Sequence, residues 1–403
     1  MSKNTAVDQG TETLASRLTS GAAWHAFCDR LRAVGDSLLG RDYPASDIDR
    51  AEGFRHLTRL TVFALQWHVE FADRAFPAFY RFNDDVVKWG APNNDNHYYR
   101  AAIDPTGTYR VSGNVSGVRQ LIISTPEGDM QLEKYRVFEE RNLSQLQLGA
   151  DGSLEVILSP DPHPGNWIPL HPDVDHVLVR QYVSDWERDA VAAMHIERLD
   201  NAAAAPDRLR PDALAHQLDA AAEWVERSTQ YWNTFTSNLR HMPANRLSEP
   251  HTPAGGARDI LYGGGWWQLG PDEALIIECQ VPEAQYWSIQ LYSFAWFESL
   301  DVAHRQNSLS GHQIDADGDG CFRVVIAHED PGVRNWLDTE GRPDGVVSYR
   351  WVWSRTAPTP RTTVVPFASV RAHLPAGVRV ATRDERRIER ARRAAAVARR
   401  FRV

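Results

Sequence analysis

Two stretches of the sequence decide the fold, DGSLEVILSPDPHPGNWIPLHPDVDHVLVRQYV at 151–183 and DGCFRVVIAHEDPGVRNWLDTEGRPDGVVSYRWVW at 319–353. Each begins with an Asp-Gly turn, continues through a strand pattern and a Pro-containing loop to Asn-Trp, and ends in a strand that contains Arg. The corresponding residues follow one another in the same order and at nearly equal spacing. Because self-similarity of this kind is the sequence signature of repeated units, we infer an internal duplication.

The Asn-Trp pairs of the two copies, Asn166 with Trp167 and Asn335 with Trp336, allow two interpretations. In the first, the indole covers one end of a β-sandwich while the Asn side chain satisfies backbone groups of the loop. In the second, the Asn faces a ligand and the Trp stacks on it. The pattern favours the first interpretation and leaves the second open.

Strand patterns surround each copy. Short runs of β-branched and aromatic residues alternate with turn signals over 91–200, and they resume from Trp266 to about Val370. The connections are too short to hold crossover helices, which predicts antiparallel pairing. Tyr109 and Tyr286, each four residues after a Pro in a turn between strand-like runs, extend the similarity upstream. We therefore predict a mainly β protein with two tandem antiparallel β-sandwich units.

Helical patterns flank and separate these units. Apolar residues recur at helical spacing over 14–39, 46–76 and 211–239. Ser46 followed by Asp47 and Asp49 is typical of a helix N-cap with acidic residues in the first turn, and Pro77 is expected to end that helix. The predicted organisation is an N-terminal helical region (1–90), a first sandwich (91–200), a helical connector (201–262), a second sandwich (263–375) and a basic C-terminal helix (376–403).

The C-terminal segment is strongly basic. Nine Arg and three acidic residues lie between Arg383 and Arg402, whereas the whole chain has a net charge of −9. An apolar stripe at helical spacing consists of Ile388, Ala391, Ala395, Ala398 and Phe401. We expect this helix to dock on the acidic body or to contact a second copy of the chain in a homo-oligomer. Binding to anionic lipid is the weaker alternative, because the stripe is mostly Ala.

The composition, with 42% hydrophobic and 24% charged residues, is that of a folded globular protein. The acidic net charge argues against nucleic-acid binding, because neutralising phosphates requires a basic surface. Cys28, Cys279 and Cys321 form no CxxC pair and cannot all be paired, which predicts a reducing compartment. The sequence shows no apolar leader and no apolar run of about 18 residues, so we predict a soluble, cytoplasmic protein without a membrane span.

The two Asn-Trp segments resemble the signature of a known family. NWIPLHPDVDHVLVRQYVSDW at 166–186 and DPGVRNWLDTEGRPDGVVSYRWVW at 330–353 are similar to the Asn-Trp-Leu-Pro…Arg-x-Tyr signature of bacterial domain-of-unknown-function family twelve-fourteen. The resemblance covers most of residues 90–365 and implies a pair of jelly-roll-like sandwiches, in a family that often accompanies a sister β-domain, number twelve-fifty-four. It implies no reaction, cofactor or catalytic residue. The second copy departs from the signature, with Asp338 in place of Pro and Trp351 in place of Leu-Tyr.

No strong catalytic or metal motif is present in the sequence: HExxH, GxSxG, the P-loop and the strand–GxGxxG–helix unit are all missing. His163, His171 and His176 cluster around the first Asn-Trp loop. The second copy has His328 alone in the comparable region, so we interpret the three as solvated loop histidines in preference to metal ligands. We expect no metal and no other cofactor.

An acidic, polar segment joins the helical region to the first sandwich. Its Asp84, Asp85 and Asp95 could chelate Mg²⁺ or act as acid and base, or they could belong to a helix C-terminal turn and a polar loop. Asp95 and Tyr98 belong to a dense mixed group at an interdomain junction, where clefts tend to form. We count these two as candidate ligand-binding residues.

The leading catalytic candidate is His304. It lies near Glu298 and Asp301 in the sequence, and a carboxylate beside an imidazole would set its tautomer and make it a general base. Surface salt bridging is the alternative for this group. The candidate substrate-binding residues are Trp287, Trp296, Asn335 and Trp336, together with Arg180 and Arg350 as anion binders. We predict a cofactor-independent enzyme that transfers protons, as a lyase, isomerase or hydratase does, on a hydrophobic or cyclic small molecule in a cleft between the units.

Two other functions stay open. In the first, the protein binds a small molecule or assembles without catalysis, and the duplicated sandwiches are its scaffold. An aromatic pocket without convergent His and carboxylate would favour binding, whereas a titratable cluster in one pocket would favour catalysis. In the second, a Mg-dependent enzyme uses the acidic segment at 84–95.

Overall fold

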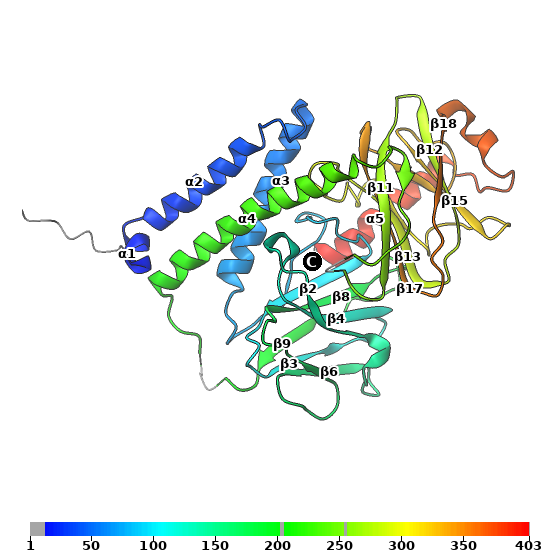
Figure 1. The fold of residues 1–403 in the computed structure, drawn as a ribbon. Helices are drawn as coiled ribbons and strands as arrows, with labels where there is room; N and C mark the ends of the chain where they lie inside the picture. Colours follow the sequence, from blue (N-terminus) through cyan, green and yellow to red (C-terminus); the bar gives the residue numbers. More distant parts are fainter. Residues whose placement is uncertain (1–12, 202–204, 254–255, 403) are drawn as a thin grey trace, which may run out of the picture.

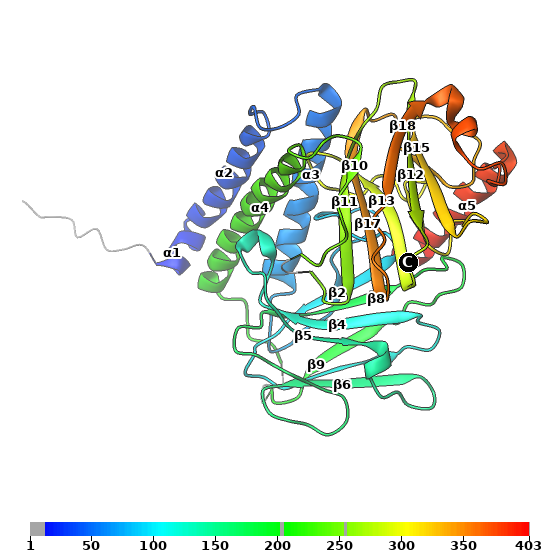
Figure 2. The same ribbon diagram turned by 45° about the vertical axis from the view of Figure 1, so that its right-hand side comes forward.

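The computed structural model describes residues 13–201, 205–253 and 256–402, so the predictions for residues 1–12 lie outside it. A first β unit lies below and a second at the upper right of Figure 1, with helices α1 to α4 at the left. The strands of the two units run at a steep angle to each other (Figure 2). Within the described residues, no helix combines the length and the apolar character that a membrane crossing requires. The predicted mainly β fold with helical additions is confirmed.

The first unit consists of two sheets. The larger has the order β1-β2-β8-β4-β5 and is antiparallel, and the smaller has the order β7-β6-β3-β9, in which β6 and β7 run parallel. The strands are β1 (Tyr80–Arg81), β2 (Asn96–Ala102), β3 (Tyr109–Asn114), β4 (Gln120–Pro126), β5 (Val137–Asn142), β6 (Ser153–Ser159), β7 (Trp167–Pro169), β8 (His176–Tyr182) and β9 (Met194–Arg198).

The second unit also consists of two sheets. Their orders are β10-β11-β17-β13-β14 and β16-β15-β12-β18, and β15 and β16 run parallel. The strands are β10 (Arg246–Leu247), β11 (Ile260–Gln268), β12 (Glu273–Gln280), β13 (Ala284–Tyr292), β14 (Ser308–Ser310), β15 (Cys321–Ala327), β16 (Trp336–Asp338), β17 (Asp344–Ser354) and β18 (Arg361–Pro366). Strands β1 and β10 lie outside the predicted sandwich ranges, so both units begin earlier than the sequence indicated.

The second unit repeats the first strand for strand. Adding nine to every strand number of the first unit reproduces both sheet orders of the second. The Asp-Gly turns share the left-handed backbone, with a φ of 78° at both Gly152 and Gly320. Tyr98 pairs with Arg180 across β2 and β8, as Tyr262 pairs with Arg350 across β11 and β17. Sheet order, turns and register therefore all support the internal duplication.

One predicted equivalence is wrong. Tyr109 begins β3, whereas Tyr286 lies in β13, which is the counterpart of β4. The counterpart of β3 is β12. The same spacing from Pro to Tyr occurs in two different turns, because a turn before a strand needs similar residues wherever it lies in the sandwich.

Each unit encloses its own core between its two sheets. Buried Val111, Val156 and Val179 belong to the core of the first unit, and the core of the second is built in the same way from β12, β15 and β17. Successive side chains of a strand point to opposite faces. The alternate residues of β8 and β17, including Arg180 and Arg350, therefore point out of the sandwiches, toward the region where the two units meet.

Helices cover one side of this arrangement (Figure 1). The α-helices are α1 (Leu14–Thr19), α2 (Ala22–Ser37), α3 (Asp47–Leu65), α4 (Pro211–Leu239) and α5 (Arg383–Phe401); a π-helix (Gln66–Glu70) continues α3, and short 3₁₀ turns are Met130–Leu132, Leu143–Gln145 and Phe367–His373. The Ser46 hydroxyl accepts a hydrogen bond from the Asp49 N–H at 3.2 Å, which confirms the predicted N-cap. The helical segment ends at Glu70, so Pro77 is not its terminator.

Helix α5 docks on the body of the protein, as predicted, but with a different face. Ile388, Ala391 and Ala395 of the predicted apolar stripe are exposed. The buried face contains Arg386, Arg393, Ala396, Val397, Arg400 and Phe401. The three arginines donate hydrogen bonds to backbone carbonyls of the body, which makes burial of their guanidinium groups possible. The stripe prediction failed because an Arg stem can pack like an apolar side chain once its head finds acceptors.

Close contact between β11 and β17 makes Gly264 of β11 sensitive to substitution. A Cβ atom added to Gly264 would lie 2.3 Å from the Val347 carbonyl oxygen, so the backbone would have to shift. We expect Gly264→Ala to lower the free energy of unfolding by about 1–3 kcal/mol, the usual cost of overpacking. Chemical denaturation would measure this. Gly318→Ala is the matched control, since no atom lies within 4 Å of its added Cβ, and equal losses in both variants would contradict the prediction.

Candidate functional site

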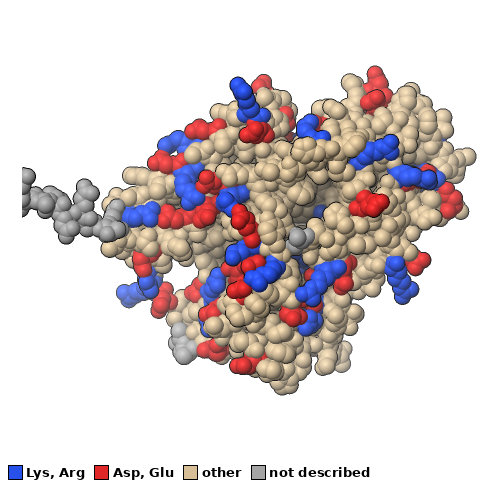
Figure 3. Space-filling model, in the orientation of Figure 1, with Lys and Arg blue, Asp and Glu red and all other residues tan. Residues whose placement is uncertain are grey.

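A cavity of about 540 Å³ lies where the two β units and α4 meet. Its walls are the outward faces of the two larger sheets, formed mainly by β2, β4 and β8 in the first unit and by β11 and β17 in the second. Figure 3 shows a hollow near the middle of one face, with charged side chains of both signs interspersed around it. Such a volume is in the range of small-molecule sites.

The cavity wall is aromatic and basic. Its aromatic side chains are Phe82, Trp89, Tyr98, Tyr135, Tyr182, Tyr231, Trp232, Phe235, Tyr262 and Phe297. Its basic side chains are Arg100, Lys134, Arg136, Arg180 and Arg350, with His176 and His251 beside them. Among the described residues of the lining, Asp129 is the one acidic side chain. A wall of this composition suits a ligand with a planar apolar body and a negative or strongly polar group.

Two copies of one Tyr–Arg pair face the cavity. Tyr98 is paired with Arg180, and Tyr262 with Arg350, at corresponding registers of the two larger sheets. All four side chains line the cavity. The duplication therefore places the same pair on opposite walls of one space.

The two arginines differ in their partners. Arg350 donates to the Tyr292 hydroxyl at 2.9 Å and to the Ala91 carbonyl at 2.8 Å, so it fastens the segment before β2 to the second unit. Arg180 has no hydrogen bond and no ion pair with any described residue. The part of the Arg180 side chain that is accessible faces the cavity, and the walls of the cavity enclose the guanidinium group.

A second polar cluster lines the wall at the end of β8 nearest the π-helix. Arg100 forms an ion pair with Asp129 at 3.1 Å, and its guanidinium carbon lies 3.6 Å from the centre of the Trp67 ring in that π-helix. His176 Nδ1 lies 3.1 Å from Asp175 Oδ2 and 3.3 Å from Arg100. Burial and the Arg100 charge lower the pKa of His176, although Asp175 opposes them, so its imidazole is neutral near pH 7. π-Helical turns inside α-helices are frequent at functional sites.

Two residues with left-handed backbone meet at the cavity. Ala91 has a φ of 49° and Phe297 a φ of 50°, and the Ala91 N–H donates to the Phe297 carbonyl at 2.8 Å. Both line the cavity. Such a backbone is unfavourable for a side chain like Phe and persists where the surroundings impose it, which is common at ligand sites.

Comparison with known proteins identifies the family. The model of a family described as "Protein of unknown function (DUF1214)" matches residues 127–185 and 272–354, which hold corresponding strands of the two units. The chain is 37% identical to a putative uncharacterized protein from Burkholderia cenocepacia, over 88% of this chain and 100% of that one, with a TM-score of 0.84. The chain belongs to the DUF1214 family.

Other comparisons add less. The VPA0106 protein from Vibrio parahaemolyticus is 12% identical over 77% of this chain and 96% of that one, with a TM-score of 0.47. No curated protein matches the chain. The resemblance to this family that the Asn-Trp signature indicates is confirmed.

The predicted catalytic residues of this DUF1214 protein lie outside the cavity. His304 Nδ1 lies 3.0 Å from Asp301 Oδ1, and both side chains are exposed at the surface. Glu298 is buried elsewhere, in contact with His56 and Arg59 of α3. The structure therefore brings His304 and Asp301 together as a surface pair, the alternative named for them, and separates Glu298 from both.

The predicted tryptophans pack in cores. Trp287 stacks on Phe322 inside the second unit, with 4.7 Å between ring centroids. Trp296 stacks on Tyr43 at 5.5 Å, between the helices and the second unit. Neither lines the cavity described above.

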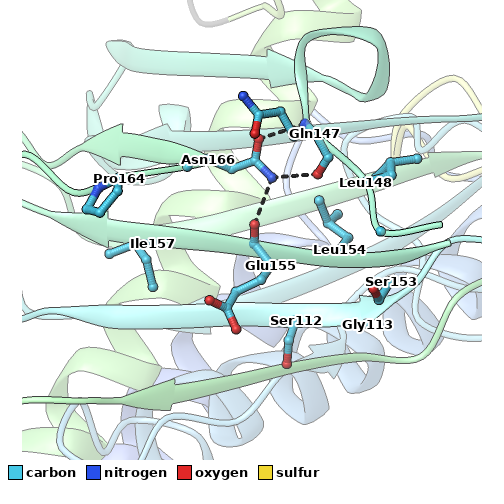
Figure 4. Close-up of a pocket in the computed structure, with 12 residues that line it drawn as sticks. Ser112, Gly113, Gln147, Leu148, Ser153, Leu154, Glu155, Ile157, Pro164 and Asn166 are labelled. Carbon is cyan, nitrogen blue, oxygen red and sulfur yellow. Dashed lines mark hydrogen bonds between the residues drawn. The ribbon is translucent and has the colours of Figure 1, made fainter. Parts of the chain in front are cut away.

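The Asn-Trp pairs make the same contacts in both units. In each, the Asn amide donates to two backbone carbonyls and accepts from one backbone N–H. Figure 4 shows Asn166 bonded to Gln147 and Glu155 beside a pocket on the outer face of the smaller sheet. The Trp167 and Trp336 indoles donate to carbonyls at the ends of β6 and β15. These contacts correspond to the first interpretation, in which the Asn side chain satisfies backbone groups of the loop. Asn335 and Trp336 do not line the cavity.

The acidic candidates do not converge. Asp84 accepts from backbone N–H groups of its own turn, Asp85 pairs with Arg402, and Asp95 is fully buried beneath α5. Among the described residues, no group of three or more His, Cys, Asp or Glu side chains could hold a metal ion. Of the two junction candidates, Tyr98 lines the cavity and Asp95 does not.

The prediction for the three histidines holds for two of them. His163 and His171 are exposed, but His176 is 3% exposed, because it begins β8 instead of lying in a loop. Sequence reasoning therefore missed His176 as a site residue. It also missed Asp129 and Tyr262. The alternation of β8 was the signal that could have found His176, because it places His176, Arg180 and Tyr182 at outward positions of the strand.

Proposed function

We propose that this protein binds a small organic molecule with an apolar, ring-shaped body in the cavity between its duplicated units. The observation that carries the proposal is the cavity itself, an aromatic space of about 540 Å³ onto which both units present the same Tyr–Arg pair. Predicted site residues Arg180, Arg350 and Tyr98 all belong to this wall. The other predicted site residues lie elsewhere, so the proposal does not depend on them.

Proton-transfer catalysis in the same cavity is the second candidate function, and His176 favours it. A neutral imidazole with a carboxylate at Nδ1 is suited to act as a general base, because the carboxylate stabilises the charge that the ring acquires. Asp175 would fill the orienting role that we first gave to Glu298 or Asp301. His176, in place of His304, would then be the general base of a lyase, isomerase or hydratase reaction.

We infer that each unit is a jelly-roll variant, since the chain passes repeatedly between two facing sheets, as from β2 to β3 to β4. Two more inferences concern the location of the protein and its contact with a second copy. The three free cysteines support a cytoplasmic location, because thiols persist in reducing compartments. Contact with a second copy of the chain through the exposed face of α5 is a further proposal.

Filling the cavity tests the proposed function. Ser348 lines it from β17, and we expect Ser348→Trp to occupy the space that a ligand would use. The probe is 1-anilinonaphthalene-8-sulfonate, whose fluorescence rises when its rings enter an apolar site. We expect it to bind the wild-type protein, with an affinity lowered about tenfold or more in the variant, since about 1.4 kcal/mol of lost contact suffices.

The matched control is Ser112→Trp, at the pocket on the smaller sheet in Figure 4. This variant should bind the probe like the wild type. Equal binding by the wild type and Ser348→Trp, or no binding by the wild type, would refute the proposed function.

A further inference from the structure

Arg180 is enclosed without a counter-ion. Protein surrounds its guanidinium group, which faces the cavity, and it has no acceptor and no carboxylate within ion-pair distance among the described residues. An enclosed charge is costly unless it is paired and hydrogen-bonded. The arrangement therefore has a place for an anion.

The other basic groups of the wall are already occupied. Arg100 is paired with Asp129, and Arg136 and Lys134 with Glu127. Arg350 has no carboxylate partner, but it donates to Tyr292 and Ala91, whereas Arg180 has no acceptor among the described residues. The planar guanidinium of Arg180 matches a carboxylate, which it can bind with two parallel hydrogen bonds.

Tyr262 supplies a donor on the facing wall, within electrostatic range of Arg180. Its hydroxyl has no hydrogen-bond partner among the described residues, and its side chain faces the cavity from the opposite wall. Burial raises the pKa of this phenol, so it keeps its proton. An unpaired hydroxyl and an unpaired guanidinium on facing walls define one anionic position.

Glu140 is the acid that acts on Arg180 electrostatically, and it forms no ion pair with it. Burial raises the pKa of the Glu140 carboxyl, and the charge of Arg180 opposes that shift. Among the described residues, both Glu140 carboxylate oxygens lack a hydrogen-bond partner, so Glu140 takes up none of the Arg180 N–H groups. These N–H groups remain open to an acceptor from outside the chain.

We propose that the ligand carries one carboxylate, which Arg180 binds through its guanidinium group and Tyr262 through its hydroxyl, while its ring lies among the aromatic side chains of α4. This proposal rests on the proposed function, since it names the ligand class of the same cavity. Trp232 and Phe235 of α4 form the aromatic part together with Phe297, whose ring centroid lies 5.6 and 5.1 Å from theirs.

Three probes with one ring system test the proposal: 2-naphthoate, its neutral counterpart 2-naphthylmethanol, and 2-naphthyl phosphate. Calorimetry would measure their affinities for the full chain. We expect 2-naphthoate to bind more tightly than the other two. Arg180→Gln should weaken 2-naphthoate by about 10- to 100-fold, the usual value of hydrogen bonds to a charged group, and leave 2-naphthylmethanol unchanged.

Two control variants separate the explanations. Arg136→Gln removes another arginine of the lining whose charge is already paired, and it should leave 2-naphthoate binding within about twofold, as expected for an exposed ion pair. Glu140→Gln should raise 2-naphthoate affinity by much less than tenfold, because Glu140 forms no ion pair with Arg180. A rise of tenfold or more in Glu140→Gln would show that Glu140 is the counter-ion of Arg180 and would overturn the proposal.

The remaining outcomes distinguish this proposal from the proposed function. Binding of 2-naphthylmethanol as tightly as 2-naphthoate, or tighter binding of 2-naphthyl phosphate, would overturn the carboxylate assignment and leave a small-molecule site in place. Unchanged 2-naphthoate affinity in Arg180→Gln would do the same. Failure of all three probes to bind the wild-type chain would overturn both.

Discussion

Glu298→Gln is expected to lower the free energy of unfolding by about 3–5 kcal/mol, the usual result of removing one partner from a buried ion pair. The Glu298 side chain is 8% exposed, and its Oε1 lies 2.8 Å from His56 Nδ1 while Oε2 pairs with Arg59. Lys88 is buried in the same region and donates to the Leu300 carbonyl. Without the carboxylate, the charges of Arg59 and Lys88 stay buried and uncompensated.

The pH dependence of this loss has a definite sign. Burial raises the pKa of Glu298, but the hydrogen bond from His56 and the charges of His56, Arg59 and Lys88 outweigh it, and the net pKa is lowered. The stabilisation is therefore present above the unfolded pKa of about 4.3 and is lost as the pH falls through the lower folded value. Denaturation from pH 7 to pH 3 should show the wild type and the variant converging at the acid end.

The control for Glu298→Gln is Glu197→Gln. Glu197 pairs with Arg110 on the surface of the smaller sheet of the first unit, where both side chains are more than one third exposed. We expect a change of about 1 kcal/mol or less. If both variants lowered the free energy of unfolding by the same small amount, Glu298 would not hold α3 to the second unit. A functional role for Glu298 would then regain support.

The architecture was predictable because duplication leaves a pattern in the sequence. The Asp-Gly and Asn-Trp pairs survive in both units, because each has the same structural role in its sandwich. Arg180 and Arg350 occupy the same register but differ in their partners. The periodic helix at 211–239 was predicted with the bounds that α4 has. The wrong match of Tyr109 with Tyr286 shows the limit, because one turn motif serves two positions of the same unit.

The cavity was predictable in place but not in its residues. A cleft between duplicated units follows from duplication. Arg180 and Arg350 were found as matching strand positions of the two repeats, and Tyr98 as a member of the dense group at the interdomain junction. His304 was chosen because it lies near acidic and aromatic residues in the sequence. Nearness along a chain does not tell which face of a loop a side chain occupies, and this one faces solvent. Asp129 and the α4 aromatics reach the cavity by tertiary packing alone.

Asp95→Ala is expected to destabilise the protein by about 3–5 kcal/mol, because it removes the acceptor at the centre of a buried network. Asp95 is fully buried and accepts from the Trp186 indole at 2.7 Å and the Tyr286 hydroxyl at 2.6 Å. The Arg393 and Arg400 guanidinium groups of α5 lie on the Trp186 ring, at 4.6 and 4.4 Å from its centroid. The carboxyl group therefore connects the first unit, the second unit and α5.

Two readouts separate this role from simple loss of packing. Hydrogen exchange should quicken along residues 383–401 in Asp95→Ala, because Trp186, the ring under both arginines, loses its anchor. Asp95→Asn keeps the shape and one acceptor oxygen, so its free energy of unfolding should lie between those of the wild type and Asp95→Ala. Asp161 is exposed, and Asp161→Ala should change the free energy of unfolding by about 0.5 kcal/mol or less. Unchanged exchange in α5 would mean that the helix is held by Arg386, Arg393 and Arg400 through their backbone acceptors alone, and that Asp95 joins only the two β units. In that case the cavity between the units, and not the position of the helix, would be what Asp95→Ala disturbs.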